Sequence, residues 1–446
     1  MSPNHQGGAA SRPRTATIDE RPPAEERADW YLSSRPVYSG GNEVVLLRGG
    51  DALFASMHEA IAAARTEVWV ATYIFSEDPA ASALAQALAA AAQRGVSVRV
   101  VVDGFGSEHS QAALQRLLGE AGAGFAVFRP LTSWRSWLQP NQLRRLHQKL
   151  CVVDARVAFV GGINLIDDRF DLHHGWAEVP RLDYAVRLRG AVVGPIEQTV
   201  RAMWTRARFG SDWRDEVRDI ARDPRPMMAA RRLLRTLRVV APGQVPKEAL
   251  EALPAVRAAF VVRDNLRQRR TIERAYIEAL QRARERAVIV SPYFYPGRRF
   301  RQALGQAARR GVDVRLLLQG NADYRIAAMA ARALYEGLLA RGVRIFEYQP
   351  AFLHAKVALV DRDWATIGSS NIDPLSMLLN LEANIVVSDH GFAATLAAAL
   401  ERDFADSVEV CPVTRREPTL LGRARRVCVA WIARAYLRLA GFTGKY

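Results

Sequence analysis

Two copies of one short pattern in this chain contain the residue types needed for chemistry on phosphate. Both copies read H-x-K-x-x-x-x-D, and their defined residues are His147, Lys149 and Asp154 in the first and His354, Lys356 and Asp361 in the second. The chain has only four lysines against 58 arginines, and two of the four lie in these patterns. A repeated motif built on so rare a residue indicates a paired functional site.

The spacing within the motif suits the binding of an anion. In an extended chain, residues two apart project from the same side, so each histidine is expected beside its lysine. The lysine supplies positive charge to phosphate oxygens, and a neutral imidazole can act as a nucleophile or a proton donor. Because a lysine cation would repel a metal cation, the motif predicts a site without a metal or other cofactor.

One copy of the motif would supply half of a mechanism. Displacing an alcohol from a phosphodiester requires an attacking group on one side and an acid for the leaving oxygen on the other. Two copies that meet across a pseudo-two-fold axis would supply both groups, with two lysines between them. The sequence therefore predicts one active site shared by both motifs.

Further polar residues follow each motif at matched places. Asn164 and Asn371 each end a turn of small residues, and they could donate to the same phosphate or only shape the turn. Asp183 and Glu382 interrupt apolar, strand-like runs, which favours a role in holding the histidine tautomers over a role as surface carboxylates. These four residues complete the predicted site.

The acidic residue of each motif has a second interpretation. Asp154 and Asp361 fall at the far ends of the predicted strands, where the following residues resemble hairpin turns. Tying the turn, and so orienting the motif, is favoured over direct contact with substrate.

The rest of the chain is also duplicated. Residues 68–75 resemble 288–294, and residues 94–103 resemble 310–319, each pair predicting buried strands. A third unit precedes each motif, and it predicts helix 108–121 with strand 123–128, then helix 325–340 with strand 343–347. This alternation predicts an α/β protein made of two duplicated α/β/α layered domains that share one active site.

The composition divides the 446 residues into five parts. A Pro-, Ala- and Arg-rich start predicts a disordered tail, and a Pro-rich basic stretch predicts a linker between the repeats. The predicted parts are a tail at 1–41, a first repeat at 42–222, a linker at 223–257, a second repeat at 258–410 and a C-terminal helix at 411–446.

Charge and cysteine content limit the class of protein. The net charge of +16 favours a polyanionic partner, either nucleic acid or an anionic membrane surface. Three isolated cysteines suit a reducing cytoplasm, and no signal peptide or transmembrane helix is predicted. The expected location is therefore the cytoplasmic face of the cell membrane, bound peripherally.

The predicted C-terminal helix supplies a candidate membrane contact. Apolar residues recur on one face at helical spacing, and Arg423, Arg426, Arg434 and Arg438 share another face. An arginine-faced helix that carries aromatic residues is typical of an anionic interface. The alternative is a terminal helix packed on the body, with its arginines in water.

The paired motifs, with their Gly-Gly-x-Asn and Gly-Ser-x-Asn tails, are similar to those of the phospholipase D superfamily. From about residue 42 to 410 the chain resembles the bacterial cardiolipin synthases, and most closely the cardiolipin synthase B type. The resemblance implies two phospholipase D-like domains and transfer of a phosphatidyl group through a phosphohistidine. By that analogy His147 is the nucleophile and His354 the acid, and phosphatidylglycerol or phosphatidylethanolamine is the substrate. Leu375 stands where many members have arginine, and Gly162 replaces a serine.

Other functions compatible with the motifs remain open. These are a phospholipase D hydrolase, a nuclease of the same superfamily and a membrane-binding protein that has lost its chemistry. The basic residues gather in amphipathic segments rather than in a groove interleaved with aromatic residues, so no nucleic acid partner is expected. Two complete motifs also argue against lost chemistry. The oligomeric state is not determined by the sequence.

Overall fold

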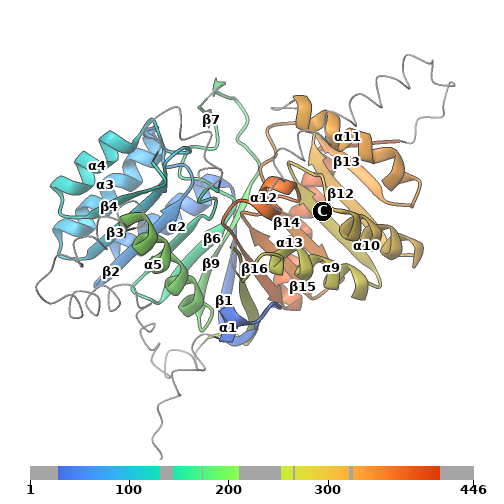
Figure 1. Ribbon diagram of the computed structural model, residues 1–446, viewed down its shortest axis with the longest axis horizontal. Coiled ribbons are helices and arrows are strands. Elements are labelled where there is room, and N and C mark those ends of the chain that lie inside the picture. The colour runs from blue at the N-terminus through green and yellow to red at the C-terminus, as the bar shows by residue number, and fades with distance from the viewer. Residues whose placement is uncertain are drawn as a thin grey trace, which may run out of the picture.

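The computed structural model describes residues 29–130, 144–172, 174–209, 253–264, 267–320 and 325–411 (Figure 1). The predicted linker and C-terminal helix lie almost entirely outside these ranges. Within them, no helix combines the length and apolar character needed to cross a membrane.

The first half alternates strands and helices, as the repeat predicted. Its elements are α1 (Asp29–Leu32), β1 (Ser39–Arg48), α2 (Gly49–Ala62), β2 (Glu67–Thr72), α3 (Pro79–Gln93), β3 (Ser97–Asp103), α4 (Gln111–Glu120), β4 (Gly124–Phe128), β5 (Leu150–Val153), β6 (Val157–Gly161), β7 (Phe170–Asp171), β8 (Gly175–Trp176), β9 (Tyr184–Gly190) and α5 (Val193–Phe209).

The second half repeats this order with small changes. Its elements are β10 (Val256–Arg263), α9 (Thr271–Arg282), β11 (Arg286–Ser291), α10 (Arg298–Arg309), β12 (Asp313–Gln319), α11 (Arg325–Leu339), β13 (Arg344–Tyr348), β14 (Val357–Val360), β15 (Trp364–Gly368), α12 (Pro374–Leu378), β16 (Glu382–Ser388), α13 (His390–Ala405) and β17 (Ser407–Glu409). The duplication predicted from the sequence is confirmed.

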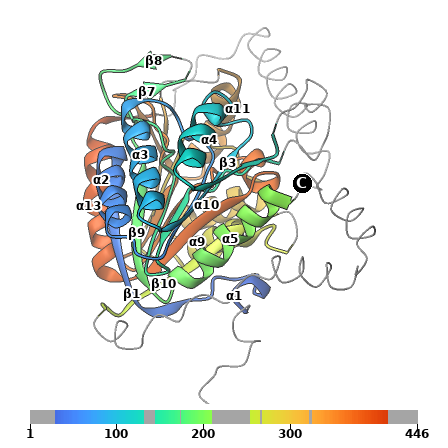
Figure 2. The ribbon, with the colours of Figure 1, turned by 90° about the vertical axis from the view of Figure 1, so that its left-hand side faces the viewer.

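The strands of both halves join in one sheet. Fifteen strands run in the order β17-β13-β12-β11-β14-β15-β16-β10-β1-β9-β6-β5-β2-β3-β4. The halves meet where β1 pairs with β10 in antiparallel fashion, and these two strands lie side by side in Figure 2. The sheet is therefore continuous through both of the layered domains that the sequence predicted, a feature that the prediction did not include.

Alternating side chains place helices on both faces of each half. In β2, Val68 and Val70 point into a core formed with α2, α3 and α4. Trp69 and Ala71 point the other way, into a core shared with α5. That second core continues through β9 and β6 into β15, β16 and α13 of the other half, so the seam between the halves is itself apolar and buried.

The predicted tail is too long at its C-terminal end. Residues 29–41, assigned to the tail, contain α1 and the start of β1. The indole of Trp30 donates to Gln198 at 2.8 Å, and its ring lies 5.7 Å from that of Phe260. Such aromatic contacts offset the entropy of ordering a segment whose composition alone reads as disordered. Strand β10 likewise begins at Val256, inside the predicted linker.

The motif aspartates tie the turns after β5 and β14. The Asp154 carboxylate accepts hydrogen bonds from the backbone N–H groups of Arg65, Thr66 and Glu67 at 2.8–2.9 Å. Asp361 accepts from residues 284–286 in the same way. Both aspartates adopt positive φ, near 51° and 53°, in the left-handed region that Asp tolerates better than most residues. This supports the turn-tying interpretation.

Replacing Asp154 with alanine should therefore destabilise the fold rather than block the chemistry. Four charge-assisted hydrogen bonds are lost, three from backbone amides and one from the Thr66 hydroxyl, while the donors remain open to water. We therefore expect a loss of about 2 kcal/mol in the free energy of unfolding. Urea unfolding of Asp154→Ala measures it, and Arg156→Ala, an exposed side chain of the same turn, is the control. Lost turnover with unchanged stability would instead place Asp154 in the reaction.

Candidate active site

Backbone hydrogen bonds across the seam bring the two motifs together. Leu146 forms a bridge with Leu381 of the second half, and Leu353 forms one with Leu182 of the first. The N–H of His147 donates to Leu381 O at 3.0 Å, and the N–H of His354 donates to Leu182 O at 2.8 Å. Leu381 directly precedes Glu382, and Leu182 directly precedes Asp183. The backbone of each histidine is thus bound to the residue just before the carboxylate of the other half.

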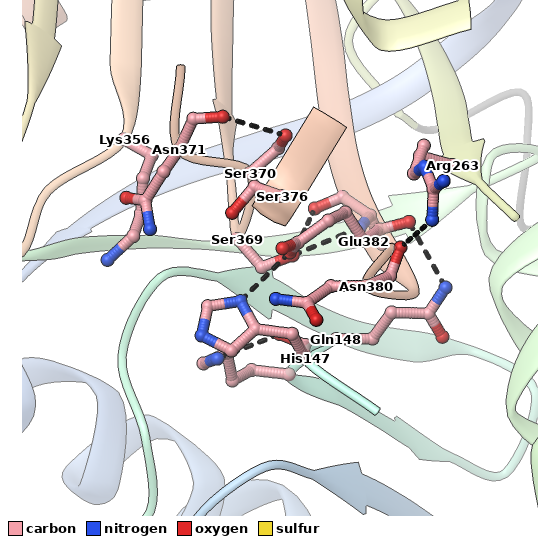
Figure 3. A network of polar contacts seen from close by, with 12 residues as sticks. His147, Gln148, Arg263, Lys356, Ser369, Ser370, Asn371, Ser376, Asn380 and Glu382 are labelled. Atoms are coloured by element: carbon pink, nitrogen blue, oxygen red, sulfur yellow. Dashed lines mark hydrogen bonds and ion pairs between the residues drawn. The ribbon is translucent and has the colours of Figure 1, made fainter. Parts of the chain in front are cut away.

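Each histidine consequently pairs with the carboxylate of the opposite half. Nδ1 of His147 lies 3.0 Å from Oε2 of Glu382, as Figure 3 shows, and Nδ1 of His354 lies 2.6 Å from Oδ2 of Asp183. A carboxylate accepts, so Nδ1 carries the proton and Nε2 keeps its lone pair for a reacting atom. Asp183 and Glu382 thus each lie within hydrogen-bond distance of a histidine Nδ1, which is the position that orienting a histidine requires.

The two motif lysines are buried beside the histidines. Lys149 is 6% exposed and Lys356 is 1% exposed, and each Nζ donates to the carbonyl of its own motif histidine. Burial lowers the pKa of Lys149 to about 7, with the charge of Lys356 adding to the shift, and burial lowers the pKa of Lys356 to about 8, with the charge of Arg181 adding to it. Nearby carboxylates oppose both shifts. Two buried cations so close together make a strong site for an anion.

Burial also keeps both imidazoles neutral. It lowers the pKa of His147, and Glu382 only partly opposes this effect. Burial lowers the pKa of His354 further, with the charges of Lys356 and Arg181 adding to the shift. Neutral histidine is the form that can attack phosphorus.

The two predicted asparagines are buried beside the motifs. Asn164 is 4% exposed and accepts weakly from Ile74 N–H at 3.4 Å. Asn371 is 6% exposed, and its Oδ1 has no hydrogen-bond partner among the described residues. A buried amide that is not fully paired within the described residues fits a group that hydrogen-bonds to substrate.

The two histidine–carboxylate pairs are not equivalent. Ser369 donates through Oγ to Oε2 of Glu382 at 2.5 Å (Figure 3), whereas the matching position of the first half is Gly162. A Cβ at Gly162 would lie 2.4 Å from Oδ1 of Asp183, so a serine does not fit there. The departure seen in the sequence thus has a steric cause.

The two carboxylates also differ in their ionisation. Burial alone would raise the pKa of Glu382, but His147, Lys149 and the Ser369 hydroxyl outweigh it and the pKa is lowered. Burial raises the pKa of Asp183 to about 7, with Lys356 opposing. His147 therefore faces a carboxylate that stays ionised, and His354 faces one that titrates near neutrality.

Two further side chains, which the sequence analysis did not predict, each accept a hydrogen bond from the backbone amide of the residue before a motif histidine. Oδ2 of Asp103 accepts from the N–H of Leu146 at 2.8 Å, and Oε1 of Gln319 accepts from the N–H of Leu353 at 2.6 Å. Both side chains end the matched strands β3 and β12. Asp103 and Gln319 occupy matching positions in the repeated runs 94–103 and 310–319. Their role was not predictable from the sequence, because it depends on which backbone amide each side chain contacts in the fold.

Other groups at the site were also not predicted. The ring of Tyr73 lies 5.0 Å from that of His147, and Nζ of Lys149 lies 5.3 Å from the same tyrosine ring. Arg263 is buried opposite Glu382 in strand register and donates to the carbonyl of Asn380 (Figure 3). None of these residues belongs to either motif. Tyr73 does lie in the repeated run 68–75, where Tyr293 is its counterpart, but the repeat predicted only a buried strand there.

Exchanging the two tail residues tests the steric difference. We expect Gly162→Ser to displace Asp183 and cost at least about a hundredfold in turnover, since a misplaced orienting group costs that much. The reciprocal Ser369→Gly should cost about tenfold, because it removes one hydrogen bond to an ionised acceptor. Equal losses from the two exchanges would contradict the proposed difference, and circular dichroism of both variants controls for folding.

Comparison with known proteins agrees with this geometry. A family model described as "Cardiolipin synthase, PLD-like domain" matches residues 57–177 and 276–405, which together make up more than half of the chain. Cardiolipin synthase B of Escherichia coli strain K12 is 38% identical over 356 residues, covering 80% of this chain and 79% of that protein. Cardiolipin synthase A of Pseudomonas aeruginosa is 35% identical over 377 residues, covering 84% and 69%.

Solved structures share the fold at low sequence identity. Phosphatidylserine synthase of Haemophilus influenzae superposes with a TM-score of 0.57 at 13% identity, covering 92% of this chain and 97% of that one. Polyphosphate kinase of Porphyromonas gingivalis gives a TM-score of 0.51 at 14% identity, covering 88% and 53%. The resemblance read from the paired motifs is confirmed, and the chain belongs to the cardiolipin synthase family with phospholipase D-like domains.

Proposed function

We propose that the chain is a phosphatidyltransferase that joins two phospholipids, typically two phosphatidylglycerols, into cardiolipin and releases glycerol. The observation that carries the proposal is the pairing of His147 with Glu382 and of His354 with Asp183, around two buried lysines. The cardiolipin synthases to which the chain is similar support the choice of substrate.

In the first step a neutral His147 attacks the donor phosphorus through Nε2. A P–N bond forms, and the P–O bond to the glycerol headgroup breaks. His354, protonated while the phosphate anion is bound, gives its proton to the leaving oxygen. Lys149 and Lys356 offset the charge that grows on the non-bridging oxygens.

In the second step the acceptor lipid resolves the intermediate. Its headgroup hydroxyl gives a proton to the now neutral His354, and its oxygen attacks phosphorus as the P–N bond breaks. His147 leaves as a neutral imidazole with Nδ1 still donating to Glu382. The enzyme returns to its starting protonation state.

The difference between the two carboxylates supports His147 as the nucleophile. An imidazole that attacks phosphorus gains positive charge, which a permanently ionised Glu382 stabilises. An acid and base must instead exchange a proton readily, which suits His354 beside an Asp183 that titrates near pH 7. The assignment of His147 as the nucleophile and His354 as the acid, which rested on family analogy in the sequence, therefore also has physical support.

Peripheral binding to an anionic membrane is part of the same proposal. The substrates are two-chain lipids, and the net charge is +16. The arginine-faced helix of residues 411–446, which would supply one contact, lies almost entirely outside the described residues. The cytoplasmic side of the membrane also stays a prediction.

Incubation with phosphatidylglycerol vesicles tests the reaction. Cardiolipin and glycerol formed in equal amounts are expected, and the lipids can be resolved by chromatography. Phosphatidic acid as the main product would mean that water is the acceptor and the chain is a hydrolase. Release of nucleotides from DNA, with no change in the lipids, would favour a nuclease.

The two histidines can be tested separately by trapping the intermediate. Both His147→Ala and His354→Ala should lower turnover by about four orders of magnitude, as for other paired catalytic residues. With phosphate-labelled lipid, His354→Ala should accumulate label on the protein in an acid-labile, alkali-stable form, and His147→Ala should not. The reverse pattern would exchange the two roles, and label on neither variant would contradict a covalent mechanism.

The buried lysines predict an alkaline limit to activity. Each lysine loses its proton as the pH rises through a pKa near 7 or 8, and a neutral amine cannot offset phosphate charge. We expect kcat/KM to fall above about pH 8, and kcat to hold to higher pH because a bound anion raises both pKa values. A kcat/KM that stays level to pH 10 would contradict this, and vesicle binding at each pH is the control.

A further inference from the structure

A short hairpin stands out from the molecule at the rim of the active site. This arm, residues 167–181, contains β7 and β8 and begins three residues after Asn164. It returns two residues before Asp183, so both of its ends lead into site residues. In Figures 1 and 2 it projects from the end of the molecule, above the line where the halves meet.

The arm belongs to the first half alone. Asn164 and Asp183 are nineteen positions apart, while the matching Asn371 and Glu382 are only eleven apart. The second half fills this shorter connection with the helix α12, packed through the buried Met377. The extra residues of the first half are therefore not needed to build the repeat or to join its site residues.

Specific contacts hold the arm in place. Arg181 donates to the carbonyl of Phe170 at 2.8 Å and lies 3.6 Å from the Asp171 carboxylate. The N–H of Gly50 donates to Asp168 at the base of the arm. His174 lies 5.7 Å, ring to ring, from Phe352 of the other half, two residues before His354. The arm thus reaches across the seam.

The arm nevertheless leaves its large apolar side chains in water. Trp176 is 59% exposed, Val179 is 44% exposed and Leu172 is 36% exposed. The indole ring of Trp176 lies 5.2 Å from the ring of Phe170 within the arm. A rigid support that exposes several apolar groups is typical of an interaction surface.

We propose that this arm docks into the interface of a phospholipid bilayer and so brings the lipid headgroups to the paired histidines. The inference rests on the proposed function, since it takes a membrane lipid as the substrate. Trp favours the headgroup level of a bilayer, where its ring is half in water and half in hydrocarbon. Because the arm lies between Asn164 and Asp183 in the chain, its docking would hold the active site next to the membrane surface.

The arm and the rest of the chain contribute different interactions with the membrane, the arm an apolar one and the rest an electrostatic one. The arm carries more acidic than basic residues, and its arginines pair with carboxylates, Arg169 with Asp51 and Arg181 with Asp171. The net charge of +16 draws the protein toward an anionic surface, which salt screens. Docking of the arm is apolar and should persist at high salt.

Vesicle sedimentation without turnover tests the arm independently of the reaction. The probe is vesicles of phosphatidylcholine mixed with phosphatidylglycerol, in high salt. We expect Trp176→Ala to weaken partitioning about tenfold, because Trp176 is the largest of the arm's exposed apolar side chains and the most exposed of them. The matched control is Leu32→Ala, which removes a side chain that is 56% exposed on α1 at the opposite end of the molecule (Figure 1).

Three results would overturn the inference. Partitioning of Trp176→Ala equal to that of the unaltered protein would show that the arm does not reach the bilayer. An equal loss in Leu32→Ala would show that any exposed apolar residue contributes. An equal loss of turnover on vesicles and on a short-chain, monomeric phosphatidylglycerol would make the arm part of the catalytic fold. A failed synthase assay with intact Trp176-dependent binding would count against the proposed function alone.

Discussion

The active site depends on the crossing of two chain segments at the seam. Two backbone bridges join the halves there, one between Leu146 and Leu381 and one between Leu353 and Leu182. The residues of each bridge are more than a hundred positions apart in the sequence. These bridges put each histidine opposite a carboxylate that its own half does not supply. The acceptor that selects the Nδ1-protonated tautomer of each histidine therefore comes from the other half of the molecule.

The surrounding structure serves to hold this crossing in place. A buried apolar core shared by both halves and the pairing of β1 with β10 keep the seam closed. Asp103 and Gln319 fix the amides that precede the histidines, and the motif aspartates fix the turns at the other ends of the strands. Burial at the seam is also what lowers the lysine pKa values, because desolvation disfavours charge.

Duplication supplies the two catalytic groups, and small departures from symmetry make them different. Ser369 and Gly162 occupy matched places, yet only Ser369 can donate to its carboxylate. The pKa of Glu382 is lowered, chiefly by His147, while burial raises the pKa of Asp183, and this contrast suits the two different roles proposed for the histidines. The arm at 167–181 is a second departure, because the second half has the short helix α12 at the matching place.

Sequence alone determined the motifs, the repeated strands and helices, and the ten candidate site residues, because each has a local signature in periodicity or spacing. Tertiary structure decided which carboxylate serves which histidine, that the two halves share one sheet, and that Asp103, Gln319 and Ser369 belong to the site. It also placed α1 and the start of β1 within the predicted tail. These features depend on contacts between distant residues, and a local pattern holds no information about which distant partner a side chain will meet.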